Sequence, residues 1–188
     1  SNDSKSLIYI SRGGESLASV YRHPLSGEPK RLFTPRASVS HYTMSPDEKS
    51  LVYTCTRPAD SARKASLAKG HNQVVYEEDW HPIDMYKVDL GTGAQELILV
   101  KQTPWGPSFS PDGKKLAFWL TPTPLIDDKY MLRRLHVMDL STGEVKRVGS
   151  SEGKVGVFKW SPNSQRIAYI AGRDAHDPKE SSVFMADL

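Results

Sequence analysis

The sequence predicts an all-β protein built from repeated four-stranded antiparallel units. Two turn patterns recur along the chain, out of phase with each other, and each is flanked by segments of strand-forming residues. No segment keeps the periodicity of an amphipathic helix over the roughly 10 to 12 residues that such a helix needs. Repeated strand pairs joined by tight turns indicate a β-sheet repeat architecture.

The first repeated pattern is a tight turn whose three copies begin at Ser45, Ser110 and Ser161. Proline sets φ for the second position of a type I turn, Asp or Asn suits the third, and glycine tolerates the positive φ that often follows. The last copy has Asn163-Ser164 where the middle copy has Asp112-Gly113, which weakens the turn without changing its assignment. Each copy therefore predicts a strand–turn–strand hairpin.

The second repeated pattern is a hairpin whose turn closes on glycine. Strand-like segments lead into Gly91-Thr92-Gly93 and Ser141-Thr142-Gly143, and a shorter version contains Ser26-Gly27. The segment Val183–Leu188 repeats the strand that precedes this turn. Because the two hairpins alternate, each unit has four strands, here named A to D in chain order. The Ser-Pro-Asp turn joins A to B, and the glycine turn joins C to D.

Four-stranded units that repeat in this way are the blades of a β-propeller. The strand count predicts a partial propeller of about three and a half blades, with the first strand A and the last strand D missing. A closed four-bladed ring with a poorly matched seam is the alternative. No linker divides the chain, so we expect one domain over residues 1–188. The expected blades are residues 7–33 (partial), 38–100, 105–149 and 155–188 (partial).

The incomplete blades predict an edge strand at each end of the array. Unpaired edges invite pairing with another chain. We therefore expect head-to-tail self-association of two copies, and we favour a fragment of a larger propeller over a closed ring.

Composition and charge argue against several classes of partner. The net charge of +3 is spread along the 188 residues, without the concentrated basic stripe of a nucleic-acid surface. No apolar stretch approaches the roughly 18 residues of a membrane span, and no glycine-rich phosphate loop is present. We expect no nucleic acid, no membrane insertion and no cofactor. The chain opens without a leader pattern, which says little about its compartment.

The turn Ser110–Lys114 with the following Leu116-Ala-Phe, together with the segment Val137–Gly143, resembles the TolB-like, or WD40-like (PD40), propeller repeat. This repeat also occurs in the N-terminal propellers of the prolyl oligopeptidase and dipeptidyl peptidase IV family. The resemblance covers nearly the whole chain. It implies a propeller fold and favours a periplasmic or secreted protein, and it leaves the function open. The Gly-His and Trp-Asp pairs of the true WD signature are absent.

For the peptidase family, the resemblance implies a propeller that caps a separate hydrolase domain and filters substrates by size. Such a hydrolase carries a Gly-x-Ser-x-Gly turn. This sequence has none, and Gly13-Gly14-Glu15-Ser16 has the wrong spacing. We therefore expect no catalytic residue and no enzyme activity in this chain. A substrate-gating propeller whose catalytic domain lies outside these residues is the alternative function.

The long connections all fall between strands B and C, in residues 57–82, 121–131 and 172–181. In a propeller the B–C connections share one face, opposite the A–B and C–D turns, and exposed loops on a rigid scaffold commonly carry binding residues. We therefore expect a protein or peptide partner on this B–C face. The candidate binding residues are Arg57, His71, Glu78, Asp79, Trp80, His81, Asp127, Asp128, Arg173, Asp174 and His176.

The acidic residues beside Trp80 and His81 suit a cation, a peptide amine or a metal ion. Alternatively, Trp80 anchors the insertion and the charges are solvated. No spacing among the six histidines matches a metallopeptidase motif, and no metal is predicted.

Several other residues have structural interpretations. Cys55 is the only cysteine, so no internal disulfide forms, and its apolar strand predicts burial. The Asp89, Asp139 and Asp187 series is typical of turn caps. Ser66 and Lys69 match part of a β-lactamase motif but are expected in a loop. Tryptophans at strand positions are expected to fill the space between blades, namely Trp105, Trp119 and Trp160.

Overall fold

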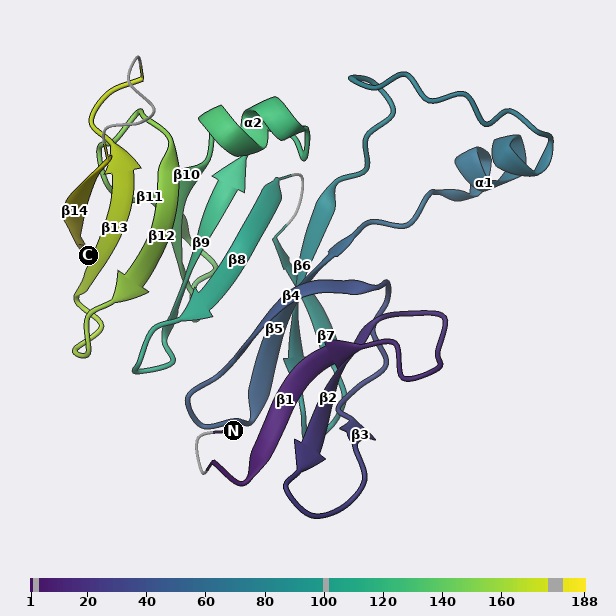
Figure 1. The fold of residues 1–188 in the computed structure, drawn as a ribbon, viewed down its shortest axis with the longest axis horizontal. Helices are drawn as coiled ribbons and strands as arrows, with labels where there is room; N and C mark the ends of the chain where they lie inside the picture. The colour runs from purple at the N-terminus through teal and green to yellow at the C-terminus, as the bar shows by residue number, and fades with distance from the viewer. Residues whose placement is uncertain (2–3, 100–101, 176–180) are drawn as a thin grey trace.

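The computed structural model describes residues 1, 4–99, 102–175 and 181–188. The strands of the described residues form four antiparallel sheets, each a meander in chain order (Figure 1). Blade 1 contains β1 (Ser6–Ser11), β2 (Ser19–Pro24) and β3 (Lys30–Arg31). Blade 2 contains β4 (Val39–Met44), β5 (Ser50–Thr56), β6 (Ile83–Asp89) and β7 (Gln95–Leu99). Blade 3 contains β8 (Thr103–Phe109), β9 (Lys115–Thr121), β10 (Arg134–Asp139) and β11 (Val145–Arg147). Blade 4 contains β12 (Val155–Trp160), β13 (Arg166–Gly172) and β14 (Ser181–Asp187).

This architecture confirms the predicted fold class, a partial β-propeller of about three and a half blades. The described residues form an open arc in which blades 1 and 4 have three strands each. The first strands of blades 2 and 3, β4 and β8, contact each other. Strand A of blades 2 and 3 therefore lies at the inner side of the arc.

The A–B turns are held by the serine that begins each copy. Ser45 Oγ donates to Asp47 Oδ1 at 2.6 Å and accepts from the backbone N–H of Ser50 at 3.0 Å. The residue after the turn has positive φ in each copy, +55° at Glu48 and +71° at Gly113. The hydrogen bond from Ser45 lowers the pKa of Asp47. The repeated Ser-Pro-Asp pattern therefore corresponds to a turn that is stabilised by hydrogen bonds of its serine side chain.

The C–D turns are capped by aspartate, as predicted. Asp89 Oδ1 accepts hydrogen bonds from the backbone of Gly91 at 2.9 Å and of Thr92 at 2.8 Å. Gly93 then takes a φ of +76°. The hydrogen bond from the Thr92 backbone lowers the pKa of Asp89. Asp139 repeats this arrangement in blade 3.

The core consists of three apolar layers, each lying between two consecutive blades. Alternation along the strands supplies them, because successive residues of a strand face opposite sides of its sheet. Between blades 3 and 4, Trp119 packs edge-on against Phe158 with ring centroids 5.4 Å apart. Trp105 and Trp160 pack against the same layer. The predicted space-filling role of the tryptophans is confirmed.

The insertions contain two short helices where the sequence predicts only loops. α1 (Ser61–Ala68) begins at Asp60, whose Oδ1 accepts from the backbone of Arg63 at 2.7 Å. α2 (Ile126–Met131) is a six-residue helix. Neither helix buries a residue, so neither has the apolar stripe that periodicity detects. Ser66 accordingly lies in a helix, and the expectation of a loop there is wrong. No helix of the described residues is long and apolar enough to cross a membrane.

Blade 4 leaves one sheet face uncovered. In blade 3, Leu135 and Val137 of strand C face blade 4 and are buried. The repeat places Val183 and Met185 at the equivalent positions of blade 4, where 76% and 65% of their surfaces are exposed. At the other end of the arc, Leu7 of β1 is also exposed. Both ends of the described arc therefore present apolar positions that are buried between internal blades.

Candidate binding face

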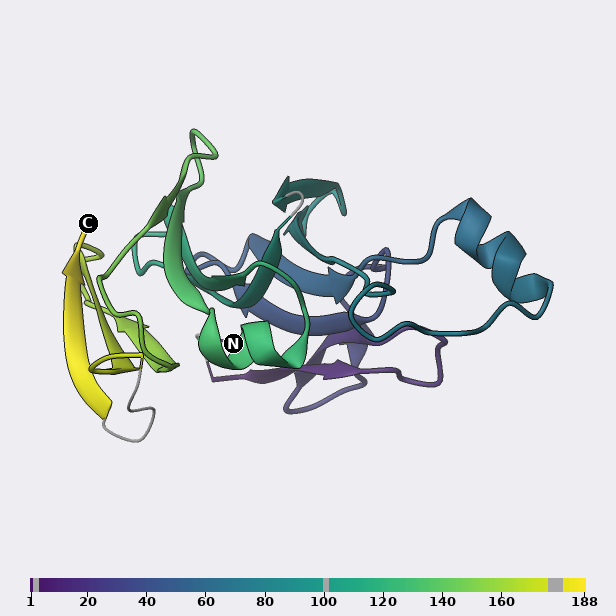
Figure 2. The same ribbon diagram turned by 90° about the horizontal axis from the view of Figure 1, so that it is seen from above.

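The described parts of the three B–C insertions leave the same side of the arc, at the top of Figure 1. They are nevertheless well separated along it. The first insertion forms an arm that carries α1 away from the sheets, whereas α2 lies close to blade 3 (Figure 2). The candidate residues that the structure describes therefore do not converge into one cluster.

An ion pair closes the base of the arm. Arg57 follows β5, and its Nε lies 3.1 and 3.0 Å from the two carboxylate oxygens of Asp84 at the start of β6. Asp84 is 3% exposed. The backbone N–H of Arg57 also donates to the carbonyl of Pro82 at 2.8 Å, which extends the β5–β6 ladder by one step. The hydrogen bond to Asp84 raises the pKa of Arg57. Arg57 is thus an anchor of the arm as well as a candidate binding residue.

A cavity of about 320 Å³ lies at this base, beside the ion pair. It brings together five of the eleven candidate residues. Its walls mix acidic, basic and aromatic side chains from both ends of the insertion. The lining residues are Arg57, Pro58, Asp60, Arg63, Glu78, Asp79, Trp80, His81 and Pro82.

Besides Arg57 and Asp60, two more charged residues at this cavity have partners in the arm. Asp79 Oδ2 accepts from the backbone N–H of Val75 at 2.9 Å and lies 4.0 Å from Arg63 Nη2. Arg63 in turn donates to the carbonyl of Gln73 at 3.0 Å. Asp79 therefore shapes the arm, while Glu78 is exposed and Trp80 is half-buried.

The remaining candidates lie away from this cavity. His71 is exposed, with its Nδ1 3.4 Å from Ser66 Oγ. Asp128 accepts from the backbone and the hydroxyl of Thr123 at 3.0 and 2.7 Å, and so holds the loop before α2. The others are Asp127 on α2, Arg173 and Asp174, which have contacts within the chain, and His176, which lies outside the described residues.

Within the described part of the chain, no group of three or more His, Cys, Asp or Glu side chains is arranged to hold a metal ion. Cys55 is buried, and burial raises the pKa of its thiol to about 11. A thiol of this kind is mostly protonated at neutral pH and is a poor nucleophile.

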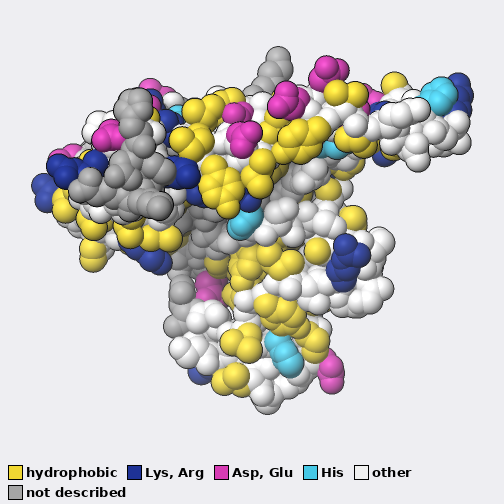
Figure 3. Space-filling model, turned by 45° about the horizontal axis from the view of Figure 1, so that its top comes forward, with side chains coloured by type: hydrophobic (Ala, Val, Ile, Leu, Met, Phe, Trp, Pro, Cys, Tyr) yellow, Lys and Arg dark blue, Asp and Glu magenta, His cyan; other side chains and the backbone are white. Residues whose placement is uncertain are grey.

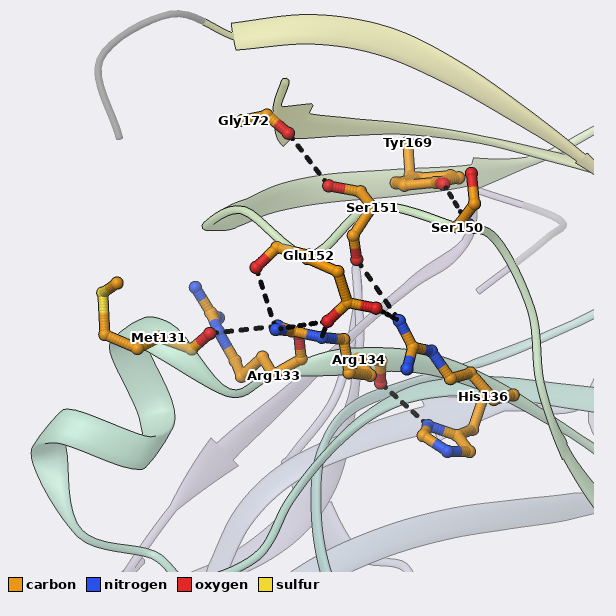
Figure 4. A network of polar contacts seen from close by, with 10 residues as sticks. Met131, Arg133, Arg134, His136, Ser150, Ser151, Glu152, Tyr169 and Gly172 are labelled. Carbon is orange, nitrogen blue, oxygen red and sulfur yellow. Dashed lines mark hydrogen bonds and ion pairs between the residues drawn. The ribbon is translucent and has the colours of Figure 1, made fainter. Parts of the chain in front are cut away.

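Polar contacts that the sequence analysis missed fasten blade 3 to blade 4 (Figure 4). Glu152 precedes β12 and accepts from Arg134 Nη2 of β10 at 3.2 Å and from Arg147 Nη2 of β11. Ser151 Oγ, which is next to it, donates to the carbonyl of Gly172 at 2.9 Å. The hydrogen bond from Arg147 lowers the pKa of Glu152. Both carboxylate oxygens of Glu152 therefore have arginine partners, and the network belongs to the interface between blades 3 and 4.

The basic and aromatic residues around α2 were also missed, because they come from separate parts of the repeat. Lys129 Nζ lies 4.4 Å from the ring centroid of Trp105 on β8, and Lys154 Nζ lies 5.8 Å from that of Tyr130. Hydrophobic side chains gather across the middle of this face, with basic and acidic ones among them (Figure 3). Of these residues, only Trp105 was singled out from the sequence, because of its position on a strand.

No family model matches the chain. Among curated proteins, it is 25% identical over 173 residues to Dipeptidyl-peptidase 5 of Porphyromonas gingivalis, covering 89% of this chain and 23% of that protein. It is 33% identical over 169 residues to a component of Eukaryotic translation initiation factor 3 of Emericella nidulans, covering 83% of this chain and 22% of that protein. The chain thus spans less than a quarter of the length of these two relatives.

Solved structures agree with the blade arrangement. A TolB-type protein from Agrobacterium tumefaciens has a TM-score of 0.67 at 19% identity, covering 100% of this chain and 59% of that one. TolB from Acinetobacter baumannii has a TM-score of 0.65 at 18% identity, covering 99% of this chain and 39% of that one. At such identities the likeness concerns the fold alone. The chain therefore has the fold of a TolB-like β-propeller.

Proposed function

We propose that this chain is a non-catalytic binding module, formed by one domain over residues 1–188, that holds a protein or peptide segment on its B–C face. The observation that carries the proposal is the cavity at the base of the arm, which gathers five candidate residues from the two ends of one insertion. Exposed Glu78 beside Trp80 suits a lysine, an arginine or a terminal amine of a peptide, because a cation pairs with both a carboxylate and an aromatic face.

The arm adds apolar contact surface next to this cavity. Val74 and Tyr76 are 71% and 61% exposed, and they follow one another with only Val75 between them. Exposed apolar residues beside a polar pocket are typical of protein interaction sites. An extended peptide with a basic residue near apolar ones matches this surface.

Replacing Trp80 by alanine is expected to weaken binding of such a peptide about tenfold, because a central aromatic residue supplies much of the energy of an interface. The probe is a fluorescein-labelled decapeptide with two lysines among valines and tyrosines, and the readout is fluorescence anisotropy. Glu78→Gln should weaken the same peptide and leave its norleucine analogue unaffected. His71→Ala, away from the cavity, is the control. Equal affinity for the parent chain and the Trp80 and Glu78 variants would contradict this location of the site.

A second function is the gating propeller of a serine peptidase. The similarity to Dipeptidyl-peptidase 5 favours it, since the aligned residues cover 89% of this chain. A Gly-x-Ser-x-Gly turn encoded by the parent gene outside these residues would support it. In that case, the cavity at the base of the arm would contact substrate on its way to the hydrolase.

We also propose that two copies associate head to tail, blade 4 of one against blade 1 of the other. The repeat supports this association, because exposed Val183 and Met185 are equivalent to Leu135 and Val137, which are buried between blades 3 and 4. Val183→Asp is expected to shift the sedimentation of the chain at high micromolar concentration from dimer to monomer, whereas Val74→Asp on the arm leaves it unchanged. A monomer at every concentration would overturn the proposal.

A further inference from the structure

Three basic side chains lie on and beside α2 at the inner side of the arc. Together with two aromatic rings they form what is here called the inner cationic cluster. It consists of Lys129, Arg133, Lys154, Trp105 and Tyr130. Lys129 and Tyr130 belong to α2, Trp105 to β8, and Lys154 immediately precedes β12. The cluster therefore joins one insertion to the inner strands of blades 3 and 4, away from the cavity at the base of the arm.

The indole of Trp105 is a fixed platform for Lys129. Trp105 Nε1 donates to Thr121 Oγ1 at 3.0 Å, which orients the ring. The backbone departs from regular pairing just after Trp105, where Gly106 has a φ of +54°. Lys129 Nζ lies 4.4 Å from the ring centroid, so the ammonium is held in place while its residue stays exposed. An ammonium over a ring keeps the N–H donors that point away from the ring free for an anion.

Arg133 is held less completely. Its Nη2 donates to the carbonyl of Val155 at 2.9 Å, and its Nε is buried without a hydrogen-bond partner. The ring of Tyr130, three positions before Arg133, lies 5.8 Å from Lys154 Nζ. Partial burial lowers the pKa of the guanidinium. A half-buried cation without a counter-charge is costly, and an anion beside it removes much of that cost.

The acidic residues nearest in sequence do not neutralise the cluster. Asp127 is two positions before Lys129 on α2, and side chains at that spacing do not face each other on a helix. Asp128 is turned to Thr123, and Glu152 is held by Arg134 and Arg147. In the part of the chain that the structure describes, no ion pair involves Lys129, Arg133 or Lys154. The cluster is therefore a net positive site with aromatic walls.

We propose that the inner cationic cluster binds a carboxylate of an extended peptide, supplied either by Asp and Glu side chains or by a free C-terminus. Three donor groups around two aromatic rings suit a planar anion flanked by apolar atoms. The proposal rests on the proposed peptide-binding function and names a second, acid-selective subsite on the same face. A partner with basic residues at the arm and acidic residues at α2 would engage both.

The test uses three decapeptides with the same N-terminal fluorophore. One is neutral and amidated, one is neutral with a free C-terminal carboxylate, and one is amidated with four glutamates. We expect a carboxylate-bearing peptide to bind about tenfold more tightly than the neutral amide, and to lose most of that advantage when salt screens the charges. Whichever of the two binds more tightly identifies the source of the carboxylate.

Amino-acid substitutions show whether the carboxylate-bearing peptide binds at the inner cationic cluster. Lys129→Ala and Lys154→Ala are each expected to raise the Kd of the carboxylate-bearing peptide about fivefold to tenfold, with Lys129→Arg close to the parent chain. Lys146→Ala is the matched control, because Lys146 is exposed on β11 and pairs with Glu144. Peptide binding should also move the indole N–H signal of Trp105 in NMR spectra, a local readout that a change in net charge alone would not produce.

Equal affinity for all three peptides, or equal effects of Lys129→Ala and Lys146→Ala, would overturn the carboxylate subsite. If the lysine peptide binds at the arm while the carboxylate peptides do not bind at all, this inference fails and the proposed function stands. If neither class of peptide binds, both fail.

Discussion

Leu135→Ala is expected to lower the free energy of unfolding by about 3 kcal/mol. Leu135 is 2% exposed and packs in the layer between blades 3 and 4, with Trp119 as its cross-strand neighbour. Truncation removes buried methyl groups and leaves a cavity that the paired sheets cannot close. Urea denaturation followed by circular dichroism measures the change, and a loss below about 1 kcal/mol would contradict the assignment of this layer as core.

The matched control is the repeat-equivalent position in the last blade. Val183→Ala should change the free energy of unfolding by no more than about 0.5 kcal/mol in dilute solution, because Val183 is 76% exposed. The same strand position is thus expected to differ several-fold in its contribution to stability. The presence of a following blade accounts for most of the difference, and the smaller side chain of valine accounts for the rest.

Gly149→Ala is expected to cost about 3 kcal/mol, through two separate effects. Gly149 has a φ of +81°, which disfavours any residue with a Cβ. In addition, a Cβ at this position would lie 2.7 Å from Cζ of Tyr169, and Tyr169 is buried in the layer between blades 3 and 4. The substitution would move Tyr169, whose hydroxyl accepts from the backbone N–H of Ser150 at 3.3 Å.

Gly143→Ala separates the two effects. Gly143 has a similar φ of +73°, but a Cβ there would meet nothing within 4 Å. It should cost about 1 kcal/mol, which is the contribution of the backbone conformation alone. Thermal unfolding of both variants measures the difference, and equal losses would show that the contact with Tyr169 relaxes freely.

The fold was predictable because the residues of each turn determine its geometry locally. Ser45 and Asp47 lock one hairpin, and Asp89 with Gly93 closes another, so the order of the strands follows from local residues alone. Burial was predictable for the same reason, since alternation along a strand assigns each residue to one of two sheet faces.

The candidate site was only partly predictable. Arg57, Glu78 and Trp80 line one cavity because a single insertion brings its own two ends together. The grouping of Lys129 with Trp105 and Lys154 depends on how blades 3 and 4 stack, which no local pattern encodes. α1 and α2 escaped detection because exposed helices carry no apolar stripe.

The three apolar layers each lie between consecutive blades, which makes the arc a linear stack of nearest neighbours. The stability of such a stack is close to a sum over its interfaces, so an inner blade is held from both sides and a terminal blade from one. A duplication or deletion of a whole blade changes that sum by one interface and leaves the other interfaces as they were.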